Sequence, residues 1–282
     1  MKVLITGVSG QLGHDAAKVL ERRGVPFLGV SSKELDITDR EAVRRMLDEY
    51  RPDAVLHCAA WTKVDQAEDE PARCMSVNAD GTRNIAGACR EIGAKLLYVS
   101  TDYVFPGTGD KPWETDDETG PLNVYGKSKL AGEEAVRAMP DRYFIVRTSW
   151  VIGEHGNNFV KTMLRLADTN PELRVVDDQI GSPTFTMDLA PLLCDMIETE
   201  KYGVYHATNE GFCSWAELAE SVFRLARKDV SVRRVSTEEY GAKAARPYNS
   251  RLSKRSLDAG GFARLPEWES SLTRLLENAG IA

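Results

Sequence analysis

Lys2-Val3-Leu4-Ile5-Thr6-Gly7-Val8-Ser9-Gly10-Gln11-Leu12-Gly13 is the stretch that decides the fold of this chain. Its first five residues form a short apolar run rich in β-branched residues, which is typical of a strand buried on both faces. Glycines spaced as Gly-x-x-Gly-x-x-Gly follow at once, and an amphipathic run continues to Arg23. A strand, a glycine turn and a helix in this order predict a dinucleotide-binding turn, because the glycines let a pyrophosphate approach and the helix offers free N–H groups. A glycine-rich turn without a ligand is the alternative.

The alternation of strand and helix continues through the first half of the chain. Apolar runs recur at residues 25–30, 54–58, 95–100 and 143–148, and helical runs lie between the strands at residues 11–23, 40–51, 74–92 and 123–138. Successive βαβ units build a parallel sheet with right-handed crossovers and with helices on both faces. We therefore predict an α/β fold with a Rossmann-type, doubly wound parallel sheet.

The regular alternation ends near Trp150. Helical runs follow at residues 158–167, 186–198, 214–226 and 268–279, and short extended runs at residues 173–176, 204–207 and 230–235. Asn157 and Ser214 are of the residue types that cap helix N-termini. The pattern predicts a nucleotide-binding domain over residues 1–150 and a smaller α+β lobe over residues 151–282, with segments interleaved between the two.

The composition argues against several classes of function. With 282 residues, 42% of them apolar and 28% charged, the chain is typical of a globular protein with a large core. A net charge of −7 argues against binding nucleic acid or a membrane surface. No apolar run approaches the ~20 residues of a membrane span, and the core strand expected at Lys2 argues against a signal peptide. The five widely spaced cysteines predict a cytoplasmic location without disulfides, and the four histidines lack the spacing of metal ligands.

Two further motifs are candidates for acid–base chemistry. In a helix over residues 121–138, Tyr125 and Lys129 lie one turn apart on one face, where an ammonium lowers the pKa of a phenol from its ordinary value of about 10. Such a pair also arises by chance in many helices. Ser100, Thr101 and Asp102 end a predicted core strand, at the edge where open α/β sheets bind ligands, although these residue types also satisfy backbone groups in turns.

Together, these motifs resemble the extended short-chain dehydrogenase/reductase superfamily. The resemblance rests on Gly7-x-x-Gly10-x-x-Gly13, Leu35-Asp36-Ile37-Thr38-Asp39, His57-Cys58-Ala59-Ala60, Ser100-Thr101-Asp102 and Tyr125-x-x-x-Lys129. Within the superfamily the chain closely resembles the dTDP-4-dehydrorhamnose reductase family. The strings that carry this resemblance are Ser100-Thr101-Asp102-Tyr103-Val104-Phe105-Pro106-Gly107, Pro121-Leu122-Asn123-Val124-Tyr125-Gly126, Arg147-Thr148-Ser149-Trp150, Gly156-Asn157-Asn158-Phe159-Val160-Lys161-Thr162-Met163, Asp178-Gln179-Ile180-Gly181-Ser182-Pro183-Thr184 and Arg246-Pro247-Tyr248-Asn249-Ser250.

The resemblance implies an NAD(P)H-dependent reduction of the C4 ketone of dTDP-4-dehydro-6-deoxy-L-mannose to dTDP-L-rhamnose, for cell-surface polysaccharide. It implies that Tyr125 protonates the new alkoxide, that Lys129 lowers the pKa of that tyrosine and holds the nicotinamide ribose, and that Thr101 binds the C4 oxygen. Cofactor contacts are implied for Gly7, Gly10, Gln11, Leu12, Gly13, Ser31, Asp36, Ile37, Ala59, Ala60, Trp61, Thr62, Ser100, Tyr125 and Lys129. Substrate contacts in a sugar-nucleotide-binding lobe and at the strand ends are implied for Val64, Asp65, Thr101, Asp102, Trp150, Asn158, Gln179 and Arg246. Trp61 departs from the histidine or tyrosine often found at its position.

Two other functions stay open at this point. One is a nucleotide-sugar dehydratase or epimerase of the same fold. A dehydratase needs an additional acid and base, and here Tyr103 follows Asp102 where a glutamate would be required. The other is a non-catalytic regulatory subunit of the methionine adenosyltransferase type, which resembles these reductases while acting as a binding partner.

The cofactor and the assembly are less constrained. The second strand ends in Gly29-Val30-Ser31-Ser32-Lys33-Glu34, without an acid at the position that usually binds the ribose 2′-hydroxyl. Ser31, Ser32 and Lys33 are suited to hold a 2′-phosphate, although such residues also form ordinary polar turns. We expect NADPH, with NADH tolerated. The sequence does not decide between a monomer and a homodimer, or whether Mg²⁺ binds at acidic residues such as Asp15 and Asp188.

Overall fold

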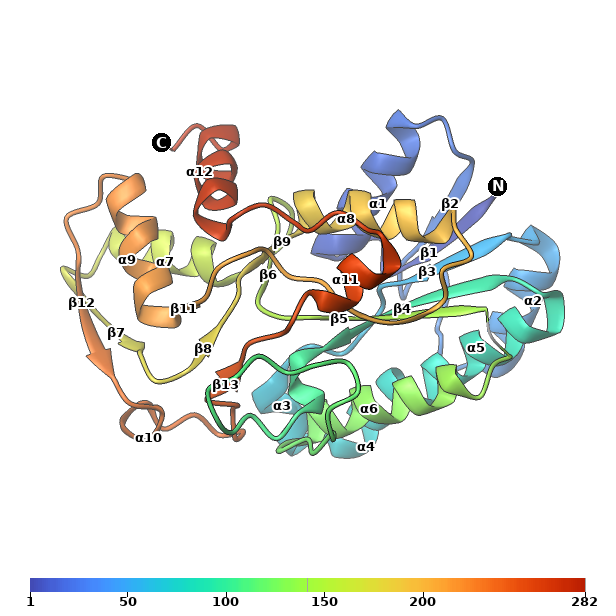
Figure 1. Cartoon of the computed structure of the whole chain (residues 1–282), viewed down its shortest axis with the longest axis horizontal. Helices are drawn as coiled ribbons and strands as arrows, with labels where there is room; N and C mark the ends of the chain where they lie inside the picture. Colours follow the sequence, from blue (N-terminus) through green and yellow to red (C-terminus); the bar gives the residue numbers. More distant parts are fainter. Residues whose placement is uncertain (141, 282) are drawn as a thin grey trace.

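A six-stranded parallel sheet forms the centre of the protein (Figure 1). The structure is a computed structural model that describes residues 1–140 and 142–281. The strands lie in the order β10-β5-β4-β3-β1-β2, and every neighbouring pair is parallel. They are β1 (Val3–Thr6), β2 (Phe27–Val30), β3 (Ala54–His57), β4 (Lys95–Thr101), β5 (Tyr143–Thr148) and β10 (Gly203–His206). The predicted doubly wound sheet is confirmed.

Helices cover both faces of this sheet, because neighbouring residues of a strand point to opposite sides. Val3 and Ile5 of β1 pack with α1 (Gln11–Arg22) and α8 (Thr186–Ile197). Leu4 packs on the other face with α2 (Arg40–Tyr50) and α5 (Thr82–Ile92), beside which α6 (Val124–Arg137) lies (Figure 1). Burial of both faces explains why the strands read as continuous apolar runs in the sequence.

The smaller lobe is built on a separate apolar cluster. Three helices supply most of it: α7 (Phe159–Ala167), α9 (Trp215–Leu225) and α12 (Trp268–Asn278). Short strands complete the lobe: β7 (Glu172–Val176) pairs with β12 (Ser231–Val235), β6 (Val151–Ile152) pairs with β9 (Thr184–Phe185), and β8 (Ile180–Gly181) lies between β11 (Cys213–Ser214) and β13 (Asn249–Ser250). The shorter helices of the chain are α3 (Val64–Asp69), α4 (Pro71–Met75), η1 (Ser76–Gly81), η2 (Asp102–Val104), α10 (Thr237–Tyr240) and α11 (Arg255–Gly260).

Two segments that follow residue 150 lie with the main sheet. β10 pairs with β5 at the sheet edge, and α8 packs on α1. Their local patterns predict a strand and a helix but carry no information about which unit they join. The division of the chain into residues 1–150 and 151–282 stays a prediction.

One local prediction is refined by the structure and another was wrong. The helix expected over residues 74–92 consists of α4, a π-helical stretch η1 and α5, because an apolar period does not reveal an inserted residue. Asn158, and not Asn157, caps α7: its side chain accepts a hydrogen bond from the backbone N–H of Lys161 at 3.1 Å. The predicted cap at Ser214 is confirmed, and together with Glu217 it forms a capping box at the start of α9. Within residues 1–140 and 142–281, no helix has the length and apolar character needed to cross a membrane.

Candidate active site

The glycine turn lies between β1 and α1, at the point where the strand order reverses between β1 and β3. Gly7 has a φ of 73°, and a Cβ at this position would lie 2.7 Å from the backbone nitrogen of Ala59. A Cβ at Gly13 would collide with the carbonyl oxygen of Gly7. Backbone atoms of neighbouring residues therefore crowd both positions, so only glycine fits at Gly7 and Gly13. Among the residues that the structure describes, no side chain caps α1, so the N–H groups of its first turn remain available to an anion.

Two cavities open at this edge of the sheet. The larger, of about 450 Å³, lies between the glycine turn, the ends of β4 and β5, and α6. The smaller, of about 250 Å³, lies between the glycine turn and the ends of β2 and β3. They share Gly7, Gly10, Cys58 and Ala60 as lining residues, so they adjoin at the glycine turn.

Most of the predicted site residues line these cavities. The larger cavity is lined by Gly7, Gly10, Gln11, Leu12, Gly13, Ala60, Thr62, Val64, Ser100, Thr101, Asp102, Tyr125, Lys129 and Trp150. The smaller cavity is lined by Gly7, Gly10, Ser31, Asp36, Ile37, Ala59 and Ala60. The fold thus brings together residues that are more than a hundred positions apart in the chain, because the carboxyl ends of parallel strands meet at one edge.

Tyr125 and Lys129 both reach the larger cavity from α6. The amine of Lys129 donates to the carbonyl oxygen of Val99 at 2.7 Å and lies 4.0 Å from the centre of the Tyr98 ring. Burial lowers the pKa of Lys129 to about 7, although the charge of Glu133 opposes this effect. The lysine is therefore close to losing its charge at neutral pH.

The pKa of Tyr125 is raised in this structure, and the expected lowering effect of Lys129 on it stays a prediction. Burial raises the pKa of Tyr125 well above its ordinary value, and the neighbouring side chain of Thr101 offsets only part of this effect. The physical reason is that burial removes water from the phenol, which penalises its charged form more than the polar neighbours compensate. Tyr125 is thus protonated at neutral pH.

Asp102 and Thr148 leave polar atoms unpaired at the larger cavity. Thr101 Oγ1 donates to Asp102 Oδ1 at 3.0 Å, whereas Asp102 Oδ2 has no hydrogen-bond partner among the described residues. The hydroxyl of Thr148 is likewise without a partner in residues 1–140 and 142–281. Burial raises the pKa of Asp102 from 3.8 to about 6. Since buried polar atoms are almost always hydrogen-bonded in folded proteins, these two atoms indicate that the cavity accommodates a polar ligand.

Aromatic side chains form one wall of the larger cavity. Trp150 has a φ of 49°, which is unusual for a residue other than glycine, and its ring stacks on that of Trp215 with 3.7 Å between the ring centroids. The Tyr103 ring meets the Tyr125 ring edge to face, with 5.6 Å between centroids. Backbone strain of the kind seen at Trp150 clusters at binding sites, although Arg51 and Arg227 adopt a similar φ just after helices.

Five predicted site residues line neither cavity. They are Trp61, Asp65, Asn158, Gln179 and Arg246. The side-chain amide of Asn158 donates to Gln11 Oε1 at 2.9 Å, so this residue supports the glycine-turn helix, and its contact with a substrate stays a prediction. The buried amide of Gln179 donates to Thr237 Oγ1 at 3.0 Å.

The other three lie near the margin of the site. Trp61 has its backbone N–H and carbonyl bound by the side chain of Asn78, at 2.7 and 3.0 Å. Arg246 and Asp65 form a bidentate ion pair at 3.0 and 2.7 Å. The charges of both act on the pKa of Tyr103, so this pair lies close to the wall of the larger cavity.

Sequence reasoning missed seven lining residues of the larger cavity. They are Cys58, Val99, Tyr103, Thr148, Ser149, Val151 and Trp215. The rule applied to β4, that ligands bind beyond the carboxyl ends of the strands, also points to Cys58 after β3 and to Thr148 and Ser149 at the end of β5. Trp215 begins a helix in the smaller lobe and carries no local signal of its role.

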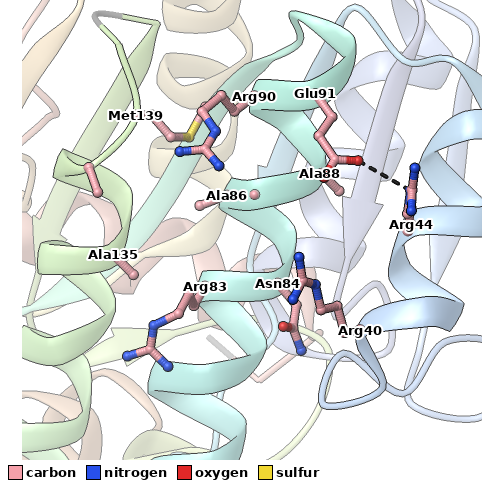
Figure 2. Close-up of a pocket in the computed structure, with 12 residues that line it drawn as sticks. Arg40, Arg44, Arg83, Asn84, Ala86, Ala88, Arg90, Glu91, Ala135 and Met139 are labelled. Atoms are coloured by element: carbon pink, nitrogen blue, oxygen red, sulfur yellow. Dashed lines mark ion pairs between the residues drawn. The ribbon is translucent and has the colours of Figure 1, made fainter.

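A separate hollow of about 330 Å³ lies between α2, α5 and α6 (Figure 2). Four arginines and several small residues line it, and no predicted site residue does so: Arg40, Arg44, Arg83, Arg90, Asn84, Ala86, Gly87, Ala88, Glu91, Ala135, Ala138 and Met139. Arg44 is paired with Glu91 at 3.3 Å, as Figure 2 shows. The hollow is separate from the candidate active site, because the glycine turn, Tyr125 and Lys129 all line the larger cavity instead. Within residues 1–140 and 142–281, no group of three or more His, Cys, Asp or Glu side chains is arranged to hold a metal ion.

Comparison with known proteins agrees with this geometry. The family model described as the RmlD substrate binding domain matches residues 1–281. The dTDP-4-dehydrorhamnose reductase of Streptomyces griseus is 46% identical over 277 residues, which are 96% of this chain and 91% of that protein. The dTDP-4-keto-6-deoxy-D-glucose reductase of Streptomyces niveus is 38% identical over 273 residues, covering 96% of this chain and 95% of the relative. The crystal structure of dTDP-4-dehydrorhamnose reductase (rfbD) from Bacillus anthracis in complex with NADP is 46% identical and superposes with a TM-score of 0.96 over 98% of this chain and 99% of that one. With a match of this extent, a glycine turn at the strand-order reversal and a tyrosine and lysine in one cavity, the chain belongs to the RmlD substrate binding domain family.

Proposed function

We propose that the protein reduces the C4 ketone of dTDP-4-dehydro-6-deoxy-L-mannose to dTDP-L-rhamnose, with NADPH as the reductant. The observation that carries this proposal is that Thr101, Tyr125 and Lys129 line one cavity with the glycine turn. The names of the Streptomyces griseus and Bacillus anthracis relatives support the substrate. The names of these relatives give no support to the epimerase or regulatory-subunit alternatives.

The crevice has the chemistry that a dinucleotide requires. The first turn of α1, to which no side-chain cap is bound, has backbone N–H groups free for a pyrophosphate, and the unpaired Asp102 Oδ2 and Thr148 hydroxyl can bind polar groups of a ligand. When bound, the reduced nicotinamide supplies the hydride. The glycine turn and α1 would hold the diphosphate, and Lys129 would donate hydrogen bonds to a ribose.

The chain's own residues supply the proton. Because burial keeps Tyr125 protonated at neutral pH, it is suited to donate its proton to an alkoxide. The hydroxyl of Thr101, which lines the same cavity as Tyr125, would orient the same oxygen. The charged form of Lys129 would stabilise the tyrosinate that remains, since an opposite charge nearby favours an ionised phenol. Trp150 and Trp215 provide an apolar wall for the sugar.

Preference for NADPH is the finer part of the proposal. In this structure the backbone N–H and the hydroxyl of Ser31 both donate to the carboxylate of Glu34, at 2.8 and 2.5 Å. A 2′-phosphate could use the same two donors, and Glu34 would have to release them. The Bacillus anthracis reductase forms a crystalline complex with NADP, which supports NADPH as the preferred cofactor here, with NADH accepted. A cytoplasmic location and a monomer or homodimer complete the proposal.

A second ketosugar is favoured by one specific observation. The Streptomyces niveus relative is named as a dTDP-4-keto-6-deoxy-D-glucose reductase. The same hydride and proton transfers serve this substrate, which differs in the configuration of its sugar ring. Both ketosugars therefore belong in the assay.

The test is a spectrophotometric assay of nicotinamide oxidation with each dTDP-ketosugar and with NADPH or NADH. We expect wild-type turnover that depends on dTDP-4-dehydrorhamnose. Tyr125→Phe should lower kcat by about two to four orders of magnitude, as expected for removal of a general acid, while NADPH still binds. Tyr240→Phe, at a tyrosine that is 56% exposed, is the matched control. Absence of turnover with either ketosugar, or near-wild-type turnover of Tyr125→Phe, would contradict the proposal.

A further inference from the structure

A buried ionic network lies directly behind Tyr125 and Lys129. Glu133 follows Lys129 by one turn of α6, and its side chain is fully buried. One of its carboxylate oxygens accepts from Ser100 Oγ at 2.6 Å and from Arg147 Nε at 2.8 Å, and the other accepts from Arg147 Nη2 at 2.8 Å. Arg147 is itself 1% exposed. The network therefore ties the helix that carries Tyr125 and Lys129 to the last residues of β4 and β5.

The helix lies very close to its neighbours at this point. A Cβ at Gly132 would lie 2.7 Å from the carbonyl oxygen of Asn78 and would collide with the hydroxyl of Tyr98. That hydroxyl donates to the carbonyl oxygen of Lys129 at 3.2 Å. Because interiors are packed almost without voids, α6 has little room to shift at this point without colliding with Tyr98 or Asn78. The bidentate ion pair of Glu133 with Arg147 lies one residue further along the helix. It fixes both the position of α6 along its axis and its rotation about that axis.

Glu133 is also the carboxylate that acts on the amine of Lys129. The groups around this amine are Tyr125 and Glu133 of α6, Tyr98 of β4, His57 and Cys58 at the end of β3, and Cys74 of α4. Burial lowers the pKa of Lys129, and the charge of Glu133 is the first of the charges that raise it. Burial raises the pKa of Glu133 in turn, but the hydrogen bonds and charge of Arg147 outweigh burial and keep it below its ordinary value. Glu133 is thus a permanently charged neighbour of the lysine.

We propose that Glu133 is a positioning residue for the reduction, which fixes α6 against the sheet and keeps the amine of Lys129 charged beside Tyr125. Ser100 and Arg147 hold its carboxylate in place from the sheet, and Arg137, one turn further along α6, pairs with it at 3.1 Å from the partly exposed side. The inference rests on the proposed function, in which the charged lysine assists Tyr125. A merely structural ion pair would hold the helix without any effect on the charge of Lys129, so the two roles differ in the pH dependence of turnover.

The experiment compares kcat as a function of pH for the wild type, Glu133→Gln and Glu134→Gln. Lys129 loses its charge as pH rises through its pKa, and removal of the neighbouring carboxylate brings this loss to lower pH. We expect the alkaline decline of kcat in Glu133→Gln to move down by roughly one pH unit, equivalent to about a tenfold loss at a fixed pH above the decline. Glu134 is the exposed neighbour on the same helix, and its variant should match the wild type.

Several outcomes would overturn the proposal. A folded Glu133→Gln protein with lower turnover at every pH and an unmoved alkaline decline would show a structural role only. If Glu133→Gln does not fold, the double variant Glu133→Gln/Arg147→Gln removes both charges of the buried ion pair, so that Arg147 is not left unpaired, and it should still show the displacement. A folded double variant with the wild-type pH dependence would also refute it.

Different results would refute the role of Glu133 and the proposed function. Loss of wild-type turnover with the ketosugars refutes the function, whereas wild-type turnover with an unmoved decline in Glu133→Gln refutes only the role of Glu133. The pH dependence of NADPH affinity, measured by fluorescence, makes the same comparison of the two glutamine variants without a sugar substrate. An affinity with the same pH dependence in both variants would count against the proposal.

Discussion

Replacement of Asp102 by asparagine should stabilise the protein, and the gain should grow with pH. Asp102 is 3% exposed, and burial raises its pKa from 3.8 to about 6. A carboxyl whose pKa is higher in the folded state contributes stability below its unfolded pKa, and this contribution is lost as pH rises through the folded value. Above pH 6 the folded protein therefore carries a buried charge that is more costly than the same charge in the unfolded chain.

The magnitude follows from the two pKa values. The difference of 2.2 between 3.8 and about 6 corresponds to about 3 kcal/mol at 1.36 kcal/mol per unit. At pH 8 the whole cost is present, whereas at pH 4 only about 0.5 kcal/mol remains, since the folded carboxyl is then protonated. Asparagine keeps the shape of the side chain and carries no charge at either pH. We expect the free energy of unfolding of Asp102→Asn to exceed that of the wild type by about 3 kcal/mol at pH 8 and by about 0.5 kcal/mol at pH 4.

Urea unfolding at the two pH values measures this difference. Asp116→Asn, at an exposed carboxylate of the nearby loop, is the control and should change stability little at either pH. The gain should be accompanied by weaker turnover, because Asp102 lines the larger cavity. Equal stabilisation at both pH values, or destabilisation at pH 8, would refute the reasoning that the buried charge of Asp102 is a cost to the fold.

Two further predictions test the parts of the site. Gly13→Ala should weaken NADPH binding at least about tenfold or displace α1, because the new Cβ collides with the carbonyl oxygen of Gly7. Gly87→Ala, where a Cβ meets nothing within 4 Å, is the control, and unchanged affinity in a folded Gly13→Ala protein would show that the turn tolerates a side chain. Arg246→Ala should raise the KM for the dTDP-sugar by roughly 10- to 100-fold and leave the KM for NADPH unchanged, in line with about 1.5–3 kcal/mol for a charged hydrogen bond. In the structure without ligand, Arg246 is paired with Asp65, which competes with the substrate for the arginine. An Arg246→Ala protein with weaker NADPH binding and an unchanged KM for the sugar nucleotide would contradict the placement of Arg246 on the substrate side.

Local patterns in the sequence determine much of the central sheet. The apolar runs that form β1, β3, β4 and β5 are largely buried on both faces, so each is poor in polar residues and stands out from its flanking turns. Parallel order then follows from the alternation with helices, and the common edge of the carboxyl ends follows from parallel order. These steps place the glycine turn near the ends of β3 and β4 without any long-range information, and the larger cavity is lined as they predict.

Contacts between distant segments were decided by the tertiary structure alone. Trp215 reaches the cavity wall by stacking on Trp150, 65 positions earlier in the chain, and nothing in its own neighbourhood marks that contact. Asn158 and Gln179 occur in strings shared with the reductase family, yet their amides bind Gln11 and Thr237. A family string records which residues occur together, whereas the partner of a side chain depends on packing.

The protonation of the site residues likewise depends partly on the local sequence and partly on the tertiary structure. The sequence determined that Tyr125 and Lys129 lie one helical turn apart, since that spacing is a property of the helix. It did not determine their proton affinities, because these depend on how much water remains around each group. Only the folded chain buries both groups, so that the pKa of Lys129 falls and that of Tyr125 rises. Only the folded chain, too, brings the charge of Glu133, paired with Arg147, to the lysine, where it opposes the effect of burial.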